Sequence, residues 1–450
     1  MLMRTLQKTL AGLALLSGSL VAGTASADTY VFITNTTPEA VSVSVHHHGS
    51  RTLANGSEWA QEATSIGPYE TKRVLRYNRY WGVKSGHTYN FDTRVTVGGS
   101  TVVMKQTMTG TWTGSNIKHG ASGADFSSPW YSNRNVYSFN TSYRSRPSET
   151  AFKAEYTGGY DDFHYTIHNK TPVEPVSGSN ALKVLSYNIY ALPMVSTLID
   201  ERLGQLPQNL KGYDVILFQE AFSSSRTSML NALRAEYPYQ THVPKISYNG
   251  INVFDSGVLV ASRYPIVKTA DFIYPDCSGT DCFADKGIIY AEVIKGGKSY
   301  HVTSTHVASF DTNEARALRQ VQFQQMRALV DAQSVPSFDA VMFGGDFNVN
   351  KLIFPTDYAQ MLANLNATNP VATGWTASTF DPRINTLAGR AGSGGTAVEY
   401  LDYVVTSNTH RQPVSARNDV RIIRSAAAPV FMTWDLSDHF PVMGEFAFAP

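Results

Sequence analysis

The sequence predicts two folded parts, an all-β, sandwich-like domain followed by a larger α/β domain in which two sheets pack between helices. The first part, residues 28–168, contains many short segments that alternate in polarity or are rich in β-branched and aromatic residues, as in β-sandwiches. A stretch rich in proline, serine and glycine, residues 169–180, is expected to be a linker. In residues 181–450 apolar, strand-like runs alternate with helical patterns, which is typical of α/β domains.

The N-terminal residues 1–27 have the features of a signal peptide. Arg4 and Lys8 precede an apolar run from Leu10 to Val21, and the segment from Ala25 to Ala27 provides the small residues that signal peptidase requires. The apolar run is too short for a transmembrane helix, which takes about 20 residues. We therefore expect a secreted protein, extracellular or periplasmic.

Within the first part, four segments have the composition of strands: residues 29–35, 40–45, 91–97 and 102–112. Two glycines between Val97 and Ser100 supply a hairpin turn. The run from His46 to His48 could indicate a metal site, but adjacent residues on a strand face opposite sides, so a loop or strand end is the alternative. The role of this domain stays open beyond a possible adhesion or targeting module.

The second part has strand-like runs that are separated by turns and by one clear helical pattern. In residues 311–334 the side chains of Ala315, Leu318, Val321, Met326 and Leu329 recur roughly on one helical face, and we expect that face to be buried. The strand-like runs are residues 182–190, 214–222, 256–267, 299–308, 340–349, 400–407 and 440–448.

Composition restricts the partners and the redox chemistry. The formal net charge is +1 and only 16% of residues are charged, so the chain lacks the basic field that nucleic-acid binding requires. The only two cysteines, Cys277 and Cys282, can form one internal disulfide in an exported chain. The alternative is that the two cysteines bind a metal or take part in redox chemistry.

Polar residues end five of the apolar runs in the second part. Each of them alone has a common explanation as a turn or a core hydrogen bonder, but a carboxylate such as Glu220 is rarely buried without a cation. Together the set suits a hard ion such as Mg²⁺, two histidines for in-line attack on phosphorus, and an amide donor for the phosphate oxygens. The residues are Asn188, Glu220, His306, Asp346, Asn348, Asp438 and His439.

The motifs "SYNIYALP", "FQEAF", "THVAS", "GGDFNVN", "LDYVV" and "SDHFPV", in this order, resemble the endonuclease/exonuclease/phosphatase superfamily, and within it the secreted bacterial neutral sphingomyelinases. The resemblance covers nearly all of residues 181–450. It implies a four-layer α/β/β/α sandwich of the DNase I-like type, preceded here by the all-β domain. The resemblance also implies Mg²⁺ as cofactor, with Mn²⁺ or Co²⁺ as possible substitutes.

The resemblance further implies a role for each motif residue. Glu220 and Asn188 would bind the Mg²⁺ ion, and Asp438 would support it through water. His439 would be the general base on water, oriented by Asp402, and His306 would stabilise or protonate the leaving alkoxide. Asp346 would position the water or a second ion, and Asn348 would hold the phosphate.

The implied reaction is hydrolysis of sphingomyelin in membranes to ceramide and phosphocholine. Residues 181–450 contain 21 lysines and arginines against 24 aspartates and glutamates, a formal charge of −3, which disfavours DNA as the substrate. A secreted DNase I-like nuclease and a non-enzymatic surface-binding protein are the alternatives. The oligomeric state stays open.

Transient contact with the membrane surface is also expected. In the family an aromatic-tipped hairpin precedes the final Asp-His motif, and here the corresponding tip is Ser425 to Ala428. Residues 430–432 and Trp434 either present an apolar edge to the lipid or pack in the ordinary way. The loop from Tyr274 to Phe283 is the other candidate contact.

Overall fold

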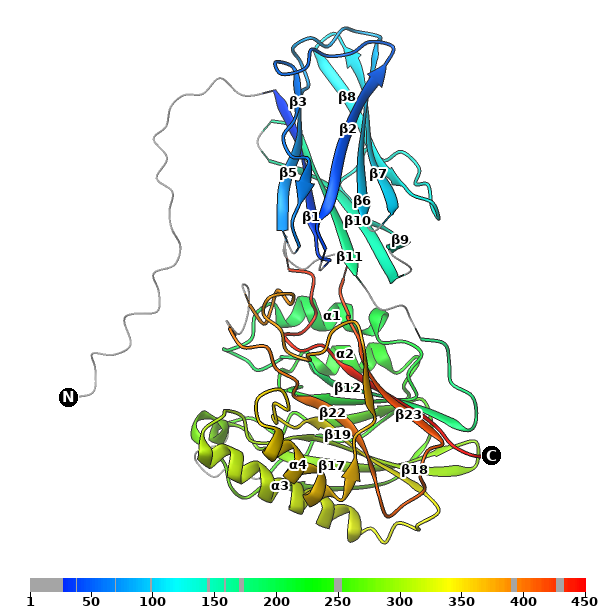
Figure 1. The fold of residues 1–450 in the computed structure, drawn as a ribbon, viewed down its shortest axis with the longest axis vertical. Helices are drawn as coiled ribbons and strands as arrows, with labels where there is room; N and C mark the ends of the chain where they lie inside the picture. Colours follow the sequence, from blue (N-terminus) through cyan, green and yellow to red (C-terminus); the bar gives the residue numbers. More distant parts are fainter. Residues whose placement is uncertain are drawn as a thin grey trace, which may run out of the picture.

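The computed structural model describes residues 27–450 except 38, 69, 98, 144–145, 158, 170–173, 247–252, 390–394 and 426–432. Residues 1–26 of the expected signal peptide and residues 430–432 of the expected membrane edge therefore lie outside the described residues. Two sheets form residues 28–169 and two more form residues 181–447, and the two halves lie end to end in Figure 1. None of the described helices is long and apolar enough to cross a bilayer.

The N-terminal half is a β-sandwich. One sheet has the order β3 (Trp59–Gln61), β5 (Glu70–Asn78), β1 (Asp28–Asn35), β11 (Asp161–Asn169), β10 (Arg146–Tyr156) and β9 (Tyr137–Tyr143). The other has the order β4 (Ser65–Ile66), β2 (Val41–Gly49), β6 (Thr88–Val97), β7 (Ser100–Thr111) and β8 (Gly114–Ser122). Apolar side chains that alternate along these strands form one core, and Val97 pairs with Ser100 across the expected hairpin.

The C-terminal half contains two mixed sheets. The seven-stranded sheet has the order β14 (Tyr239–Gln240), β15 (Leu259–Ser262), β13 (Val215–Gln219), β12 (Ala181–Asn188), β24 (Val442–Ala447), β23 (Ser415–Val420) and β21 (Val371–Gly374). The six-stranded sheet has the order β16 (Ile266–Ile273), β17 (Gly287–Lys295), β18 (Lys298–His306), β19 (Ala340–Asp346), β22 (Asp402–Ser407) and β20 (Ala367–Thr368).

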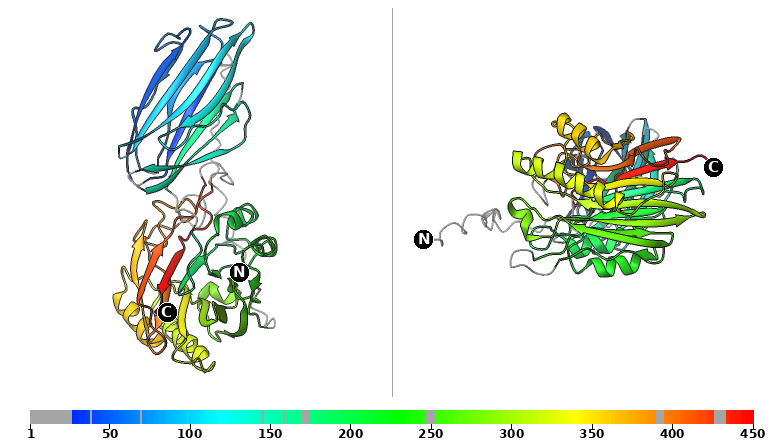
Figure 2. Two further views of the ribbon diagram at one scale, coloured as in Figure 1. Left: turned by 90° about the vertical axis from the view of Figure 1, so that its right-hand side faces the viewer. Right: turned by 90° about the horizontal axis from the view of Figure 1, so that it is seen from below.

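Helices cover the outer faces of both sheets (Figures 1 and 2). Helices α1 (Ile199–Asn209) and α2 (Arg226–Leu233) share a core with the seven-stranded sheet. Helices α3 (Asn313–Asp331) and α4 (Pro355–Leu365) share a core with the six-stranded sheet and with the inner face of the other sheet. The predicted fold class, an α/β/β/α sandwich preceded by an all-β domain, is confirmed.

The two glycines before Asp346 allow the two sheets to close around the end of β19. A Cβ atom on Gly344 would lie 2.4 Å from Leu217 Cδ1 of the facing sheet. Gly345 has φ 150°, and a Cβ there would lie 2.1 Å from the Thr305 carbonyl oxygen of the neighbouring strand. Because only glycine fits both positions, the sequence Gly-Gly-Asp brings the Asp346 carboxylate to the sheet edge.

The predicted buried face of α3 is partly wrong. Ala315 and Met326 are buried as expected, but Val321 is exposed and Arg319 is buried instead. The Arg319 guanidinium donates to the carbonyl oxygens of Ala308 and Phe310, in the loop after β18. An arginine that satisfies buried carbonyls therefore replaces an apolar residue on this face.

A buried arginine of the C-terminal half, Arg424, joins the two halves. Arg424 donates to Asp435 Oδ1 at 2.8 Å, and its Nη1 donates to the Thr36 carbonyl oxygen of the β-sandwich at 3.3 Å. The Trp434 side chain, 4% exposed, packs edge-on against the His168 ring of β11, with centroids 5.5 Å apart. Of the two alternatives for Trp434, ordinary packing therefore holds, and this side chain is not part of a membrane-facing edge.

Candidate active site

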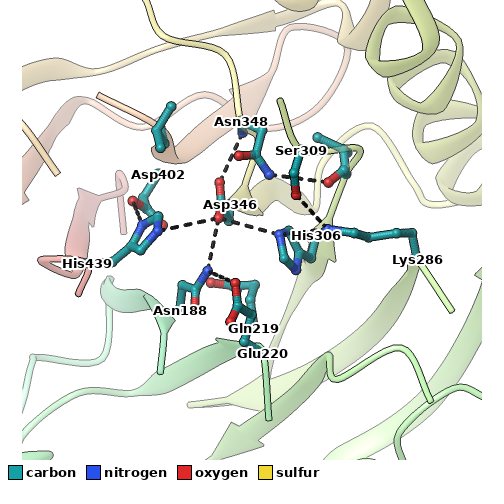
Figure 3. A network of polar contacts seen from close by, with 12 residues as sticks. Asn188, Gln219, Glu220, Lys286, His306, Ser309, Asp346, Asn348, Asp402 and His439 are labelled. Carbon is teal, nitrogen blue, oxygen red and sulfur yellow. Dashed lines mark hydrogen bonds and ion pairs between the residues drawn. The ribbon is translucent and has the colours of Figure 1, made fainter. Parts of the chain in front are cut away.

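The site lies at one edge of the two stacked sheets, where parallel strands end together. Strands β12 and β13 are parallel, as are β18 and β19, and the register pairs Asn188 with Gln219 and His306 with Asp346. Strand β22 begins at Asp402, opposite Asp346. Most of the predicted site residues come from these strand ends and the loops after them, and His439 comes from the segment before β24. Those labelled in Figure 3 are Asn188, Glu220, His306, Asp346, Asn348, Asp402 and His439.

Asp346 is at the centre of the cluster and is 1% exposed. Its Oδ2 accepts a hydrogen bond from Asn188 Nδ2 at 3.0 Å and lies 3.6 Å from His306 Nε2 and 3.9 Å from His439 Nε2. Its Oδ1 accepts from the backbone N–H of Asn348 at 3.0 Å. Figure 3 shows the two imidazoles on either side of this carboxylate.

Glu220 follows β13 in the left-handed region, with φ 54°. Its Oε1 accepts a hydrogen bond from Asn188 Nδ2 at 3.0 Å, so one amide group joins Glu220 to Asp346. The Asn188 Oδ1 accepts from the Tyr190 backbone N–H at 3.0 Å, which fixes the orientation of the amide. Burial, and next the charge of Asp438, raise the pKa of Glu220 to about 7. This carboxylate therefore gains from a nearby cation.

His439 and Asp402 form a buried pair. The Asp402 Oδ2 lies 2.8 Å from His439 Nδ1, and Asp402 is held in turn by its backbone N–H, which donates to Thr379 Oγ1 at 3.2 Å. Burial would lower the pKa of His439, but the charges of Asp402, Asp346 and Asp438 hold it well above the usual value. Burial also raises the pKa of Asp402, to about 6. With Nδ1 bonded to Asp402, His439 Nε2 faces Asp346.

On the other side of Asp346, His306 contacts a lysine that the sequence analysis did not assign to the site. Lys286 Nζ lies 2.9 Å from His306 Nε2 and donates to Ser309 Oγ at 3.1 Å. Burial and the charges of Lys286 and His439 lower the pKa of His306 well below its usual value. His306 is therefore neutral near pH 7, and Lys286 carries the positive charge on this side.

A disulfide-closed loop lies beside Lys286. The expected Cys277–Cys282 disulfide is formed and encloses most of a short 3₁₀ helix, η1 (Gly279–Phe283). Within this loop, Asp281 Oδ2 accepts from the Ser309 backbone N–H at 2.6 Å, and Asp281 Oδ1 lies 3.6 Å from Lys286 Nζ. The loop therefore pairs the buried lysine with a carboxylate.

Asn348 and Asp438 lie at the margins of the cluster. Asn348 has φ 49°, and its Nδ2 donates to the Val307 carbonyl oxygen at 3.3 Å, which leaves one amide hydrogen for another acceptor. Asp438 is 5% exposed, and Ser437 before it donates from Oγ to the Asn188 carbonyl oxygen at 2.6 Å. All eight predicted site residues thus lie at the same sheet edge.

Comparisons with known proteins show which family the chain resembles. The model of the Endonuclease/Exonuclease/phosphatase family matches residues 185–439. The sphingomyelinase C of Listeria ivanovii is 32% identical over 292 residues, 58% of this chain and 85% of the relative.

Solved structures give the same result. The crystal structure of sphingomyelinase C from Streptomyces griseocarneus has 30% identity and a TM-score of 0.52, over 59% of this chain and 99% of that one. A crystal structure of a Staphylococcus aureus beta toxin mutant with bound magnesium ions gives the same identity, TM-score and coverage. The expected enzyme class, a hydrolase of phosphoric diester bonds, is confirmed, and the chain belongs to the Endonuclease/Exonuclease/phosphatase family.

Proposed function

We propose that this protein is a secreted, Mg²⁺-dependent phosphodiesterase that hydrolyses sphingomyelin to ceramide and phosphocholine. The observation that carries the reaction is the placement of two imidazoles on either side of buried Asp346, with the Glu220 carboxylate joined to it through Asn188. This arrangement suits in-line displacement at phosphorus, in which water attacks from one side and the alkoxide leaves from the other.

The donor atoms fit a hard divalent cation. Glu220 and Asp438 offer carboxylate oxygens, and the Asn188 amide, whose Oδ1 accepts from the Tyr190 N–H, would turn to offer that oxygen to the ion. Burial raises the pKa of Glu220 to about 7, and a cation beside it would favour the ionised carboxylate. Asp346, Asp402 and His439 also offer ligand atoms within 4.8 Å of one another, but a cation bound there through His439 Nε2 would occupy the nitrogen that takes the proton from water in this proposal. We therefore place the ion on the Glu220 side, where it would polarise a phosphoryl oxygen when bound. Mn²⁺ or Co²⁺ could substitute.

The two histidines have different roles in this proposal. His439 takes a proton from water at Nε2, while Asp402 holds Nδ1 and stabilises the imidazolium that forms. His306 Nε2 accepts from the Lys286 ammonium, so in this state Nε2 carries no proton for a leaving alkoxide. The site therefore supplies charge on this side through Lys286, and the proposed role of His306 is stabilisation and not protonation. Asn348 offers its second amide hydrogen to the phosphate.

Exposed apolar side chains support access to a membrane substrate. Met194, 91% exposed, and Val195 lie in the loop after β12. Phe283 of η1 and Phe310 after β18 are also more than half exposed. The loop at Phe283 is held in place by a backbone hydrogen bond, in which the Val253 N–H donates to the Phe283 carbonyl oxygen. These loops follow strands that end at the site, so their apolar side chains lie at the same edge. The surface fits a lipid bilayer better than a nucleic acid.

The reaction is tested by phosphocholine release from sphingomyelin vesicles, with Mg²⁺ and with excess chelator. We expect release that stops with the chelator and in His439→Gln. Plasmid DNA in the same buffer should stay intact, since cleavage of the plasmid without lipid hydrolysis would favour a nuclease. If neither substrate is cleaved, the enzymatic proposal is wrong.

Membrane contact is tested separately, by sedimentation with sphingomyelin vesicles. The double variant Met194→Ser with Phe283→Ser should bind vesicles more weakly and keep its activity on a soluble phosphocholine ester. Phe338→Ser is the matched control, because Phe338 is 73% exposed but precedes β19 at the opposite sheet edge. Equal binding by both variants would contradict the proposed surface.

A further inference from the structure

We propose a second metal site, for a zinc ion, on the outer face of the N-terminal β-sandwich. Its ligands are His46 and His48 of β2 and Asp92 of the neighbouring strand β6. The His48 Nε2 lies 3.3 Å from Asp92 Oδ2, and each of the three residues offers a ligand atom within 4.8 Å of the others. The His46 and His48 rings are stacked, with centroids 5.0 Å apart and planes inclined by 15°.

Strand geometry selects two of the three adjacent histidines. His46 and His48 are two positions apart, so their side chains lie on the same face of β2, and Asp92 is the strand partner of His46. His47 faces the other side, where its Nδ1 lies 2.8 Å from the Asn90 carbonyl oxygen and its ring stacks on Phe91 at 4.2 Å. The alternation that prevents three adjacent histidines from sharing one ion therefore leaves the outer two together.

The chemistry of these ligands differs from that of the catalytic cluster. Two imidazoles and one carboxylate suit Zn²⁺, which binds nitrogen at about 2.0–2.1 Å and oxygen at about 2.0–2.2 Å, whereas Mg²⁺ prefers oxygen alone. Ligand atoms around a tetrahedral zinc lie roughly 3.3 Å apart, which His48 and Asp92 already satisfy. His46 is exposed, so its ring can rotate to close the remaining distance. The fourth position stays open to water or to a donor from another molecule.

The lysine nearest to Asp92 in the sheet, Lys105, has an aromatic partner of its own. Lys105 is the strand partner of Asp92 on β7, and it could compete for the carboxylate. Its ammonium lies over the Trp130 ring, 5.0 Å from the centroid. This cation–π contact gives the lysine a partner of its own.

The test is a calorimetric titration of the full chain with Zn²⁺ in the presence of saturating Mg²⁺, which occupies the proposed catalytic site. We expect one zinc ion to bind, and His46→Gln or His48→Gln to weaken its binding by at least about tenfold, since loss of a direct ligand costs no less than loss of a supporting residue. Asp92→Asn should also weaken it.

His242→Gln is the matched control, because His242 is an exposed imidazole that has a carboxylate, Asp271, at 3.0 Å but belongs to no group of three ligands within the described residues. It should bind zinc like the wild type. Absence of zinc binding, or equal affinity in His48→Gln and His242→Gln, would overturn the proposal. Since these side chains are at the surface, circular dichroism should show that all variants are folded.

Discussion

Replacing Asp402 by asparagine tests the proposed catalytic pair most directly. Asp402→Asn keeps the size of the side chain but removes the charge that lies 2.8 Å from His439 Nδ1. As His439 takes a proton from water, the positive charge that develops on its ring loses this partner. We therefore expect a large fall in kcat. KM should change little, because Asp402 is fully buried and does not contact the substrate in the proposed mechanism.

The size of the fall follows from the geometry. A hydrogen-bonded imidazolium and carboxylate have charge centres about 4 Å apart, where the attraction is about 4 kcal/mol at an effective dielectric constant of about 20. Losing this energy from the transition state corresponds to a decrease in kcat of about 10³-fold. The acid limb of the pH–rate profile should also move to lower pH, because removal of the Asp402 charge lowers the pKa of His439.

The assay is steady-state hydrolysis of a soluble phosphocholine ester between pH 5 and pH 9. Asp214→Asn is the matched control, since Asp214 is also fully buried and pairs with Lys295 Nζ at 2.9 Å, but precedes β13 at the opposite sheet edge. It should lose stability and keep kcat. A folded Asp402→Asn enzyme with wild-type kcat and an unmoved acid limb would refute the proposed pair.

Three other predictions concern the metal, the disulfide and the contact between the halves. Glu220→Gln should weaken Mg²⁺ binding in calorimetry. In the wild type the Mg²⁺-induced rise in Tm should shrink as the pH falls below about 7, since protonation of Glu220 then competes with the ion; a pH-independent rise would assign the ion elsewhere. The double variant Cys277→Ser with Cys282→Ser should have a free energy of unfolding in urea that is lower by about 2 kcal/mol, and a lower kcat. A wild-type kcat would show that the loop does not influence the site through Lys286. Arg424→Met leaves Asp435 buried without its cation and should cost about 3–5 kcal/mol; an unchanged urea midpoint would show that the pair is not needed.

The polar strand ends could be predicted because each of them interrupts an apolar run. Asn188, His306 and Asp346 are the last residues of buried strands, and Glu220 directly follows one. Parallel pairing brings the ends of such strands to one edge. Lys286 gave no such signal. It precedes its strand, where a lysine usually faces solvent, and only the antiparallel register that pairs Gly287 with His306 brings its ammonium to the imidazole. A contact set by strand register cannot be inferred from local sequence.

The partly wrong face of α3 has a similar cause. Periodicity counts apolar residues and so placed Val321 on the buried face, whereas the fold buries the guanidinium of Arg319 to satisfy two carbonyl groups in the loop after β18. The Phe323 ring packs edge-on against Phe347, with centroids 5.3 Å apart, and so belongs to the buried face of α3. The hydrogen bonds that the carbonyl groups of the preceding loop require therefore decide which residues of the helix are buried, against its apolar pattern.

The contact between the halves and the active site share one stretch of chain, and this gives the β-sandwich a structural connection to catalysis. Asp435, which pairs with Arg424 at the contact, lies four residues before His439. Between them, Ser437 accepts a bond from Asn385 through its carbonyl oxygen and donates to the Asn188 carbonyl oxygen through its hydroxyl. The chain that carries His439 is thus fixed to the sandwich at one end and to strand β12 at the other. A general base must be held within a fraction of an ångström of its working position. In the proposed mechanism, the docked sandwich therefore helps to position His439, in addition to any binding role of its own surface.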